Sequence, residues 1–496
     1  MSRRKGITID TYKIEFVDRV LDPVHGFIDI TPVEKEIIQL PIFKRMQSLK
    51  QLSLTNWVFP GAEHTRYIHS LGVMYIADLM AQSLRRLDGS LRFNDGERQL
   101  LRLAGLLHDI GHYPLSHVTE YVYRDSLEGI DLDLDTHNLN IKKSIDALSQ
   151  PGKMPDYMKD RYSIQMHHEN IGTIVIKNDT DINEIIHRHC PFIDVQDILD
   201  IIVGCVNRNE KISAMVQLVH SELDADGIDY IMRDSTFSGT SYGGFELGLL
   251  LRNLVVAEYN GIEIVGIKPK GISVVDQYLV SKYFAYTQVI FNKHVAILDE
   301  MVEIFSKALI SLDKSPYPSS KTLIKYIENH DKNSEYLKFT DRTFWTQLDR
   351  LSRHDLENFI PEYIVAIYDK LQHYQEFKMV DKSEVVLTSN NKAEVCEELQ
   401  GSAIYQKLMK GCQNIILFHS RGFTSQIPEE QLRKLLKDFR EDDKAEMLMK
   451  VNPARLQEGV PVISDDEIKL LVDDKRSIMS YLYSTKTYIL REYTVE

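Results

Sequence analysis

The stretch that decides the fold is Leu106-Leu107-His108-Asp109-Ile110-Gly111-His112-Tyr113-Pro114-Leu115-Ser116-His117. A mostly apolar run leads into the adjacent His108–Asp109 pair, and Gly111 and Pro114 then end the helix. An imidazole and a carboxylate at the end of a buried helix can present a nitrogen and an oxygen to one cation. The same pair alone is also compatible with a hydrogen-bonded core histidine beside a helix-terminal aspartate. Residues elsewhere in the chain decide between these interpretations.

Three other stretches supply the same kinds of side chain: Arg66-Tyr67-Ile68-His69-Ser70-Leu71-Gly72-Val73, Met166-His167-His168-Glu169-Asn170, and Asp224 to Asp234. The first opens a segment with helical apolar spacing, which places His69 near a helix start. The third, if helical, places Asp226, Tyr230 and Asp234 on one face at i, i+4 and i+8. Carboxylates on a mostly buried helix are costly unless a cation or a donor meets them. Either a cation or a hydrogen-bond donor is therefore expected beside these carboxylates.

In this order the stretches resemble the HD-domain phosphohydrolase superfamily, in which the pattern H…HD…D surrounds a metal. Here the pattern reads His69, His108-Asp109 and Asp226. The flanking residues are similar to a narrower group, the deoxynucleoside triphosphate triphosphohydrolases, which include the bacterial dGTPase-like enzymes and the animal SAM-and-HD-domain enzyme. The matching flanks, within residues 15 to 300, are Asp22-Pro23-Val24-His25-Gly26, Gln51-Leu52, Val58-Phe59-Pro60-Gly61-Ala62, Arg66, and His69 to Val73.

The resemblance implies metal ligation by His69, His108, Asp109 and Asp226. Two imidazoles and two carboxylates give a cation four protein ligands and leave room for water. This mixed set of nitrogen and oxygen donors does not select among Mg, Mn, Zn, Fe, Co and Ni. The expected cofactor is thus a divalent metal ion of undetermined identity.

The resemblance also implies roles for the remaining polar residues. His112 is positioned for acid–base work at the α-phosphate, and His168, with Glu169 beside it to orient the ring, is a second candidate. The residues expected to bind substrate are Gln51 and Asp234 at a sugar hydroxyl, Leu52 against the 2′ position, and Arg66, His117 and Tyr230 at the phosphates. For each of these residues the alternative is ordinary packing or a structural hydrogen bond.

Three positions depart from the animal enzyme. Its active-site lysine, next to the last metal aspartate, is here Gly227, and Lys282 or Lys293 are candidates to replace it. Gln39 and Gln47 stand where that enzyme uses Asp and Arg to hold a guanine activator. A GTP-dependent activator site is therefore not expected at these positions.

Composition limits the environment and the partners. The net charge of −14 argues against nucleic acid as a partner, because a polyanion is repelled by an acidic surface. The four cysteines show no CxxC spacing, which is typical of free thiols in a reducing compartment. The sequence contains no long uninterrupted apolar segment. We expect a soluble, cytoplasmic protein with no membrane contact.

The predicted fold is mainly α: an HD phosphohydrolase core over residues 1–312 and a smaller α+β lobe over residues 313–496. In the resembled family such lobes support oligomer contacts, so a homo-oligomer, a dimer or tetramer, is expected. Local signals predict a helix start at Thr31-Pro32-Val33-Glu34 and a hairpin turn at Asn260-Gly261. They also predict one long helix from about Val274 to Leu312, and a strand pair in the tail around residues 479–490.

The function implied by the resemblance is metal-dependent hydrolysis of a deoxynucleoside triphosphate to deoxynucleoside and inorganic triphosphate. The partners would then be deoxynucleoside triphosphates, as substrates and as allosteric ligands at a subunit interface. Two alternatives remain open. The first is an HD-type phosphodiesterase or nuclease acting on cyclic or single-stranded substrates. The second is a catalytically weak nucleotide-sensing assembly.

Overall fold

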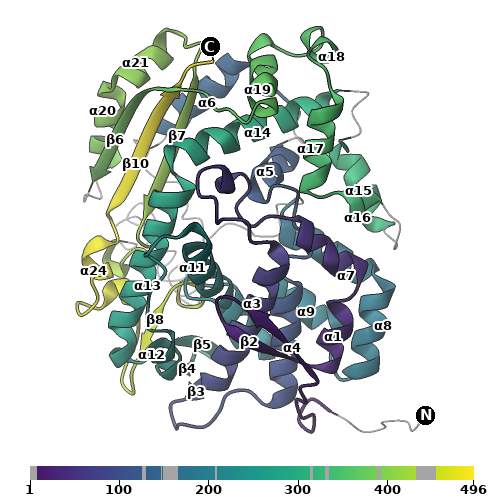
Figure 1. The fold of residues 1–496 in the computed structure, drawn as a ribbon. Helices are drawn as coiled ribbons and strands as arrows, with labels where there is room; N and C mark the ends of the chain where they lie inside the picture. The colour runs from purple at the N-terminus through teal and green to yellow at the C-terminus, as the bar shows by residue number, and fades with distance from the viewer. Residues whose placement is uncertain are drawn as a thin grey trace.

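The structure, a computed structural model, describes residues 8–125, 130–146, 148, 166–206, 209–312, 317–329, 335–387, 392–431 and 454–495. Helices make up 57% of it, with smaller sheet-containing parts, which confirms the mainly α fold class. Figure 1 shows a helical body with a three-stranded sheet, β6, β10 and β7, along one side. No helix in the described ranges has the length and apolar character needed to cross a membrane.

The elements up to residue 312 are β1 (Asp18–Asp22), β2 (Gly26–Ile30), α1 (Pro32–Ile37), α2 (Pro41–Lys44), η1 (Arg45–Ser48), η2 (Thr55–Trp57), α3 (Arg66–Ser83), β3 (Arg85–Arg86), α4 (Asp95–Leu107), α5 (His117–Asp125), α6 (Leu134–Asp146), α7 (His168–Asn178), α8 (Thr180–His189), α9 (Val195–Ile202), η6 (Glu210–Ile212), α10 (Ser213–Val219), α11 (Ala225–Ser238), α12 (Leu247–Arg252), β4 (Leu254–Tyr259), β5 (Ile262–Ile267), η7 (Pro269–Gly271), α13 (Ile272–Phe284), η8 (Ala285–Ile290) and α14 (Lys293–Ser311).

The later elements are α15 (Ser320–Glu328), α16 (Glu335–Lys338), α17 (Asp341–Arg350), α18 (Arg353–Glu357), α19 (Glu362–Gln372), β6 (Met379–Leu387), α20 (Lys392–Gly401), α21 (Ala403–Lys410), β7 (Ile415–Gly422), β8 (Pro461–Ile463), β9 (Ile468–Leu470), η9 (Leu471–Asp473), α24 (Met479–Leu482) and β10 (Lys486–Tyr493).

Helix α3 packs against both α4 and α11, and the three helices form the frame of the candidate site. Helix α4 starts at a capping box, in which Asn94 and Glu97 satisfy each other's backbone N–H groups at 2.9 Å. Leu101, Leu103 and Leu107 of this helix are fully buried. Each buried leucine contributes about 1.5–3 kcal/mol of hydrophobic stabilisation. This burial fixes the end of α4, where His108 follows.

Two local predictions are confirmed. Helix α1 begins at Pro32, and the Glu34 carboxylate accepts the backbone N–H of Thr31 at 2.9 Å. Strands β4 and β5 form an antiparallel hairpin across Asn260 and Gly261, whose φ angles are 54° and 81°. Positive φ at both central residues defines the type I′ turn that the Asn-Gly pair favours.

Two predictions about longer elements are wrong. The single helix from Val274 to Leu312 is instead α13, the π-helical turn η8, and α14. The break occurs because Asn292 takes an extended backbone and its side chain accepts the N–H of His294, which starts a new helix. In the tail, residues 479–482 form helix α24 and not a strand. Strand β10, which follows this helix, pairs with β6 and β7.

Strands from both halves of the chain meet in a second sheet of order β3-β4-β5-β8-β9. Its parallel join between β5 and β8 pairs Ile267 with Val462. Residues 313–316, at the predicted boundary between core and lobe, lie outside the described ranges. The division at residue 312 stays a prediction, and this sheet contains strands from either side of it.

Candidate metal centre and active site

Three helices bring His69, His108, Asp109 and Asp226 to one point, termed here the candidate metal cluster. His69 lies in the first turn of α3, His108 caps the C-terminus of α4, and Asp226 lies in the first turn of α11. His69 Nε2 is 2.9 Å from Asp226 Oδ1 and 3.7 Å from Asp109 Oδ2. His108 Nε2 is 3.4 Å from Asp109 Oδ1 and 3.9 Å from Asp226 Oδ1. The structure therefore brings together all four predicted ligands.

The free atoms of this cluster fit a divalent cation. The Nε2 atoms of His69 and His108 are buried without a hydrogen-bond partner among the described residues, and the Nε2 atom of His69 lies 2.9 Å from Asp226 Oδ1. The opposite ring nitrogens are occupied. His69 Nδ1 is 2.7 Å from Asp229 Oδ2, and His108 Nδ1 is 2.8 Å from the carbonyl of Gly105. A fixed Nδ1–H leaves Nε2 as a lone-pair donor, which is the usual arrangement of a metal-binding histidine.

Asp229 is the centre of an outer layer that the sequence analysis did not assign. It is fully buried and accepts from Arg233 Nε at 2.8 Å, while His25 Nε2 lies 2.5 Å from its other oxygen. Arg233 also donates to Asp22 at 2.8 Å. Burial raises the pKa of Asp229, but Arg233 and the two histidines outweigh it and hold the pKa well below the ordinary value. The i, i+4 spacing of Asp229 and Arg233 was the available signal for this pair.

Arg66 has a structural partner at the metal cluster. Its guanidinium donates to Asp109 Oδ2 at 2.8 Å and to Ser116 Oγ at 3.1 Å. Burial raises the pKa of Asp109, but the charges of Arg66 and the neighbouring histidines lower it well below its ordinary value. The predicted contact of Arg66 with phosphate stays a prediction, whereas its contact with a metal-ligand carboxylate is part of the structure.

Beside the metal cluster, His112, His117, Glu120 and His168 form a second group, termed here the histidine cluster. Glu120 Oε2 is 3.0 Å from both His117 Nδ1 and His168 Nδ1. The rings of His112 and His168 stack with centroids 4.3 Å apart. His168 Nε2 is 3.8 Å from Asp109 Oδ1, so the two clusters adjoin.

The carboxylate that orients His168 differs from the prediction. Glu169 lies 3.4 Å from His167 Nδ1 and 3.4 Å from His220 Nδ1, and Glu120 takes the position at His168. As the second residue of α7, Glu169 projects away from the ring of its neighbour, because adjacent helical side chains do not share a face. Glu120 was missed because it lies far from His168 in the sequence, although its i, i+3 spacing from His117 was visible.

The two stacked imidazoles have opposite protonation preferences. Burial lowers the pKa of His168, but the charge and hydrogen bond of Glu120 raise it to about 9. Burial and the charges of Arg66 and His168 lower the pKa of His112 well below 6.5. The Nδ1 atom of His112 accepts the N–H of Tyr113 at 3.1 Å, so in the neutral ring Nε2 carries the hydrogen. That Nε2 atom is buried without a hydrogen-bond partner in the described ranges.

The turn between His112 and His117 is held by residues from the second half of the chain. Leu115 and Ser116 have φ angles of 55° and 57°, a left-handed conformation that non-glycine residues adopt at a cost. Asp341, at the start of α17, accepts the N–H of Leu115 at 2.7 Å and that of Lys50 at 2.9 Å. The conformation of the turn therefore depends on a buried carboxylate more than two hundred residues later in the sequence.

The residues expected at the sugar lie near one another. Gln51 donates its N–H to the carbonyl of His64, and Asp234 Oδ1 is 2.8 Å from His64 Nε2. Gln51 Oε1 is buried without a hydrogen-bond partner among the described residues. Leu52 and Tyr230 are half-buried. His64, which the sequence analysis did not single out, is thus the link between Gln51 and Asp234.

The space beside Gly227 is filled by an aromatic residue. A Cβ atom at Gly227 would lie 2.3 Å from the hydroxyl of Tyr278, so a side chain at this position would need Tyr278 to move. Of the two suggested replacements for the missing lysine, Lys282 lies with its ammonium 5.9 Å from the Tyr278 ring centroid. Lys293 begins α14, and its carbonyl accepts from the hydroxyl of Tyr493 at 2.6 Å.

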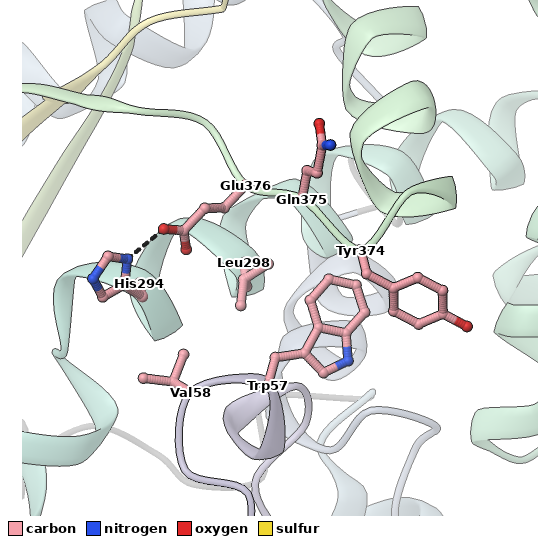
Figure 2. Close-up of a pocket in the computed structure, with 7 residues that line it drawn as sticks. All are labelled: Trp57, Val58, His294, Leu298, Tyr374, Gln375 and Glu376. Carbon is pink, nitrogen blue, oxygen red and sulfur yellow. Dashed lines mark hydrogen bonds and ion pairs between the residues drawn. The ribbon is translucent and has the colours of Figure 1, made fainter.

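A separate pocket of about 490 Å³ lies between α14, the loop around Trp57, and residues 374–376, as the close-up in Figure 2 illustrates for its lining residues. Its lining residues are Trp57, Val58, His294, Leu298, Tyr374, Gln375 and Glu376. Trp57 lies against Tyr374 with ring centroids 5.2 Å apart, and His294 pairs with Glu376. None of the predicted catalytic or metal-binding residues lines it.

Comparison with known proteins identifies the domain that carries the residues of these clusters other than Asp226. Residues 66–204 match the model of the HD domain. The protein YwfO of Bacillus subtilis, described as uncharacterized, is 30% identical over 272 residues, which are 55% of this chain and 51% of YwfO. The deoxynucleoside triphosphate triphosphohydrolase SAMHD1 of Homo sapiens is 39% identical over 118 residues, 24% of this chain and 18% of that protein. The chain thus spans about half the length, or less, of these relatives.

A solved structure supports the fold over nearly the whole chain. A hypothetical protein from Aquifex aeolicus superposes with a TM-score of 0.61 at 23% identity, covering 96% of each chain. At this identity the similarity concerns the fold alone.

These findings define an HD-domain protein whose HD residues converge on a candidate site for a metal-dependent hydrolase. Within that class, the predicted resemblance is confirmed: the chain carries an HD domain and is similar to deoxynucleoside triphosphate triphosphohydrolases such as SAMHD1.

Proposed function

We propose that the protein hydrolyses deoxynucleoside triphosphates to deoxynucleoside and inorganic triphosphate. The observation that carries this proposal is the pairing of His168 with Glu120 directly beside the candidate metal cluster. Such a pair can give a proton to the leaving oxygen. The neighbouring metal cluster can hold the phosphate whose bond to that oxygen breaks. The similar protein SAMHD1 is a deoxynucleoside triphosphate triphosphohydrolase by name, which supports this reaction.

The residues His69, His108, Asp109 and Asp226 would hold the divalent ion. When bound, such an ion polarises a phosphate oxygen and lowers the pKa of a coordinated water. The identity of the ion stays open among Mg, Mn, Zn, Fe, Co and Ni, because two imidazoles and two carboxylates suit several of them.

The two stacked histidines, His112 and His168, would have different roles in the reaction. His168 holds a proton at neutral pH, since its pKa is about 9, and can give that proton to the departing O5′ of the deoxynucleoside. His112 stays neutral and presents its Nε2–H to a non-bridging phosphate oxygen. This assigns the acid role to His168, the second candidate of the sequence analysis. A well-placed general acid contributes about 10²- to 10⁴-fold in rate.

Sugar selection would depend on Gln51, Asp234 and Leu52. Gln51 and Asp234 meet through His64 and can bind a 3′-hydroxyl, whereas Leu52 offers no partner to a 2′-hydroxyl. An unpaired buried hydroxyl costs about 1–3 kcal/mol, so deoxyribonucleotides should be preferred by roughly tenfold to over a hundredfold. His117 and Tyr230 are proposed to contact the phosphates.

The proposal is tested by chromatography of each of the four deoxynucleoside triphosphates, singly and mixed, with Mg²⁺, Mn²⁺ or Co²⁺. Deoxynucleoside and triphosphate are the expected products, lost in Asp109→Ala and reduced in His168→Ala. His187→Ala, an exposed histidine of α8, is the matched control and should behave as the parent protein.

Other products would indicate a different reaction. Monophosphate and pyrophosphate would place the cleaved bond elsewhere, and activity only on cyclic or single-stranded substrates would favour a phosphodiesterase or nuclease. Binding without turnover would favour a nucleotide sensor. A homo-oligomer with an allosteric deoxynucleotide at its interface belongs to the same proposal, and the mixed-substrate incubations test it by activation.

A further inference from the structure

The end of strand β7 is docked on the junction between α13 and η8. Phe423, just beyond the strand, stacks on Tyr283 with ring centroids 4.0 Å apart and an interplanar angle of 13°. Tyr283 also shares a 2.5 Å hydrogen bond with the hydroxyl of Thr487 in β10. Thr487 is the register partner of Arg421 across the sheet. These contacts fix the position of Arg421 relative to the helical core.

Arg421 places its charge in this junction without a matching anion. Its guanidinium carbon lies 3.7 Å from the ring centroid of Tyr286, which is in η8. Its Nε atom is buried and makes no hydrogen bond within the described ranges. No carboxylate of the described residues lies within ion-pair distance of the Arg421 guanidinium. A buried donor of an ionised group is costly when it is unpaired, so this arrangement favours a site for an external anion.

The guanidinium adjoins the side of the candidate site formed by α11. It covers Tyr286 of η8, and both η8 and α13, which carries Tyr278, pack against α11, which carries Tyr230. Tyr230 lies one helical turn after Asp226 on the same face of α11. The hydroxyl of Tyr278, which fills the space beside Gly227, is a second buried donor without a partner in the described residues.

We propose that Arg421 and the Tyr278 hydroxyl together bind the phosphate chain of the substrate, so that the C-terminal sheet completes the active site. This inference rests on the proposed function, since it assigns the phosphates to one side of that site. A guanidinium presents a planar fork that matches phosphate oxygens, and Tyr286 keeps that fork in place by stacking.

The test uses the full chain with Mn²⁺ and two measurements. Isothermal titration with inorganic tripolyphosphate measures anion binding without requiring turnover, and steady-state kinetics on a deoxynucleoside triphosphate measure KM and kcat. Arg421→Gln retains a polar stem over Tyr286 and removes the charge, and Tyr278→Phe removes only the hydroxyl. We expect tripolyphosphate affinity to fall by roughly 10- to 100-fold in Arg421→Gln, with KM rising correspondingly.

Arg421→Lys should restore part of the binding, because it returns the charge without the fork. Arg353→Ala is the matched control, since that exposed arginine of α18 pairs with Glu357 and Asp369 and should leave both measurements unchanged. Circular dichroism checks that each variant is folded.

The two proposals can fail separately. Loss of tripolyphosphate binding in Arg421→Gln and Tyr278→Phe, in a protein that hydrolyses no deoxynucleotide, would support the anion site and reject the proposed function. Hydrolysis with parental KM and parental tripolyphosphate affinity in both variants would overturn the anion site and leave the proposed function intact. Absence of tripolyphosphate binding in the parent protein would also overturn it.

Discussion

Replacement of Asp229 by asparagine would test how the metal cluster is supported. The substitution preserves the size of the side chain but removes the charge that meets Arg233 and two histidines. It also allows the amide to present N–H₂ toward His69 Nδ1. The His69 ring then loses the acceptor that fixes its tautomer, and Nε2 is no longer reserved for a metal.

The magnitude follows from the contacts. Loss of a carboxylate that orients a metal-binding histidine reduces metal affinity by about 10- to 100-fold, or roughly 1.4–2.7 kcal/mol. Removing the side chain in Asp229→Ala breaks a buried ion pair and should cost about 3–5 kcal/mol of folding free energy. Asparagine should cost less, because Arg233 retains its 2.8 Å contact with Asp22.

Metal content by elemental analysis after graded exposure to a chelator measures the first effect, and urea denaturation measures the second. Glu36→Gln is the control, because the Glu36 carboxylate pairs with the exposed Arg188 and the partly exposed His189, and its loss should change stability by less than about 1 kcal/mol. Metal content and chelator resistance equal to those of the parent protein in Asp229→Asn would refute the reasoning about the outer layer.

Three further results are expected. Activity should fall as the pH rises through about 9, because His168, whose pKa is raised to about 9, loses its proton there. Glu120→Gln should move this limb of the pH–rate profile to lower pH, because the charge and hydrogen bond of Glu120 raise that pKa. Leu52→Gly should reduce the preference for dGTP over GTP by about tenfold or more in competition assays; equal rates in the parent protein would contradict the sugar argument. Asp341→Ala leaves the N–H groups of Leu115 and Lys50 unpaired, so urea titration should detect a loss of about 1–3 kcal/mol for each, with a lower kcat.

The metal cluster could be predicted because the resemblance to the H…HD…D pattern implies its four ligands, and each ligand also lies in a recognisable local pattern. His69 follows a helix start, His108 and Asp109 end an apolar helix, and Asp226 repeats with helical spacing. Such patterns depend only on nearby residues. The mainly α fold class followed from the same resemblance together with local helical periodicity.

The supporting residues could not be predicted, because their partners are distant in the sequence. Glu120 meets His168 across a segment whose path the sequence does not reveal, and the local signal favoured Glu169. Asp341 reaches Leu115, and Arg421 reaches Tyr286, only after the second half of the chain has packed on the first. The break before α14 was missed because Asn292 competes locally with an otherwise continuous apolar pattern.

The parallel join of β5 to β8 has a consequence for biosynthesis. Ile267 can pair with Val462 only after Val462 has emerged from the ribosome, so the complete sheet of order β3-β4-β5-β8-β9 cannot form earlier. Contacts between residues so far apart in the chain carry a large loop-closure cost and form slowly. During translation the hairpin of β4 and β5 therefore presents an open edge, and we expect nascent chains to be prone to aggregation there until β8 has been made and paired.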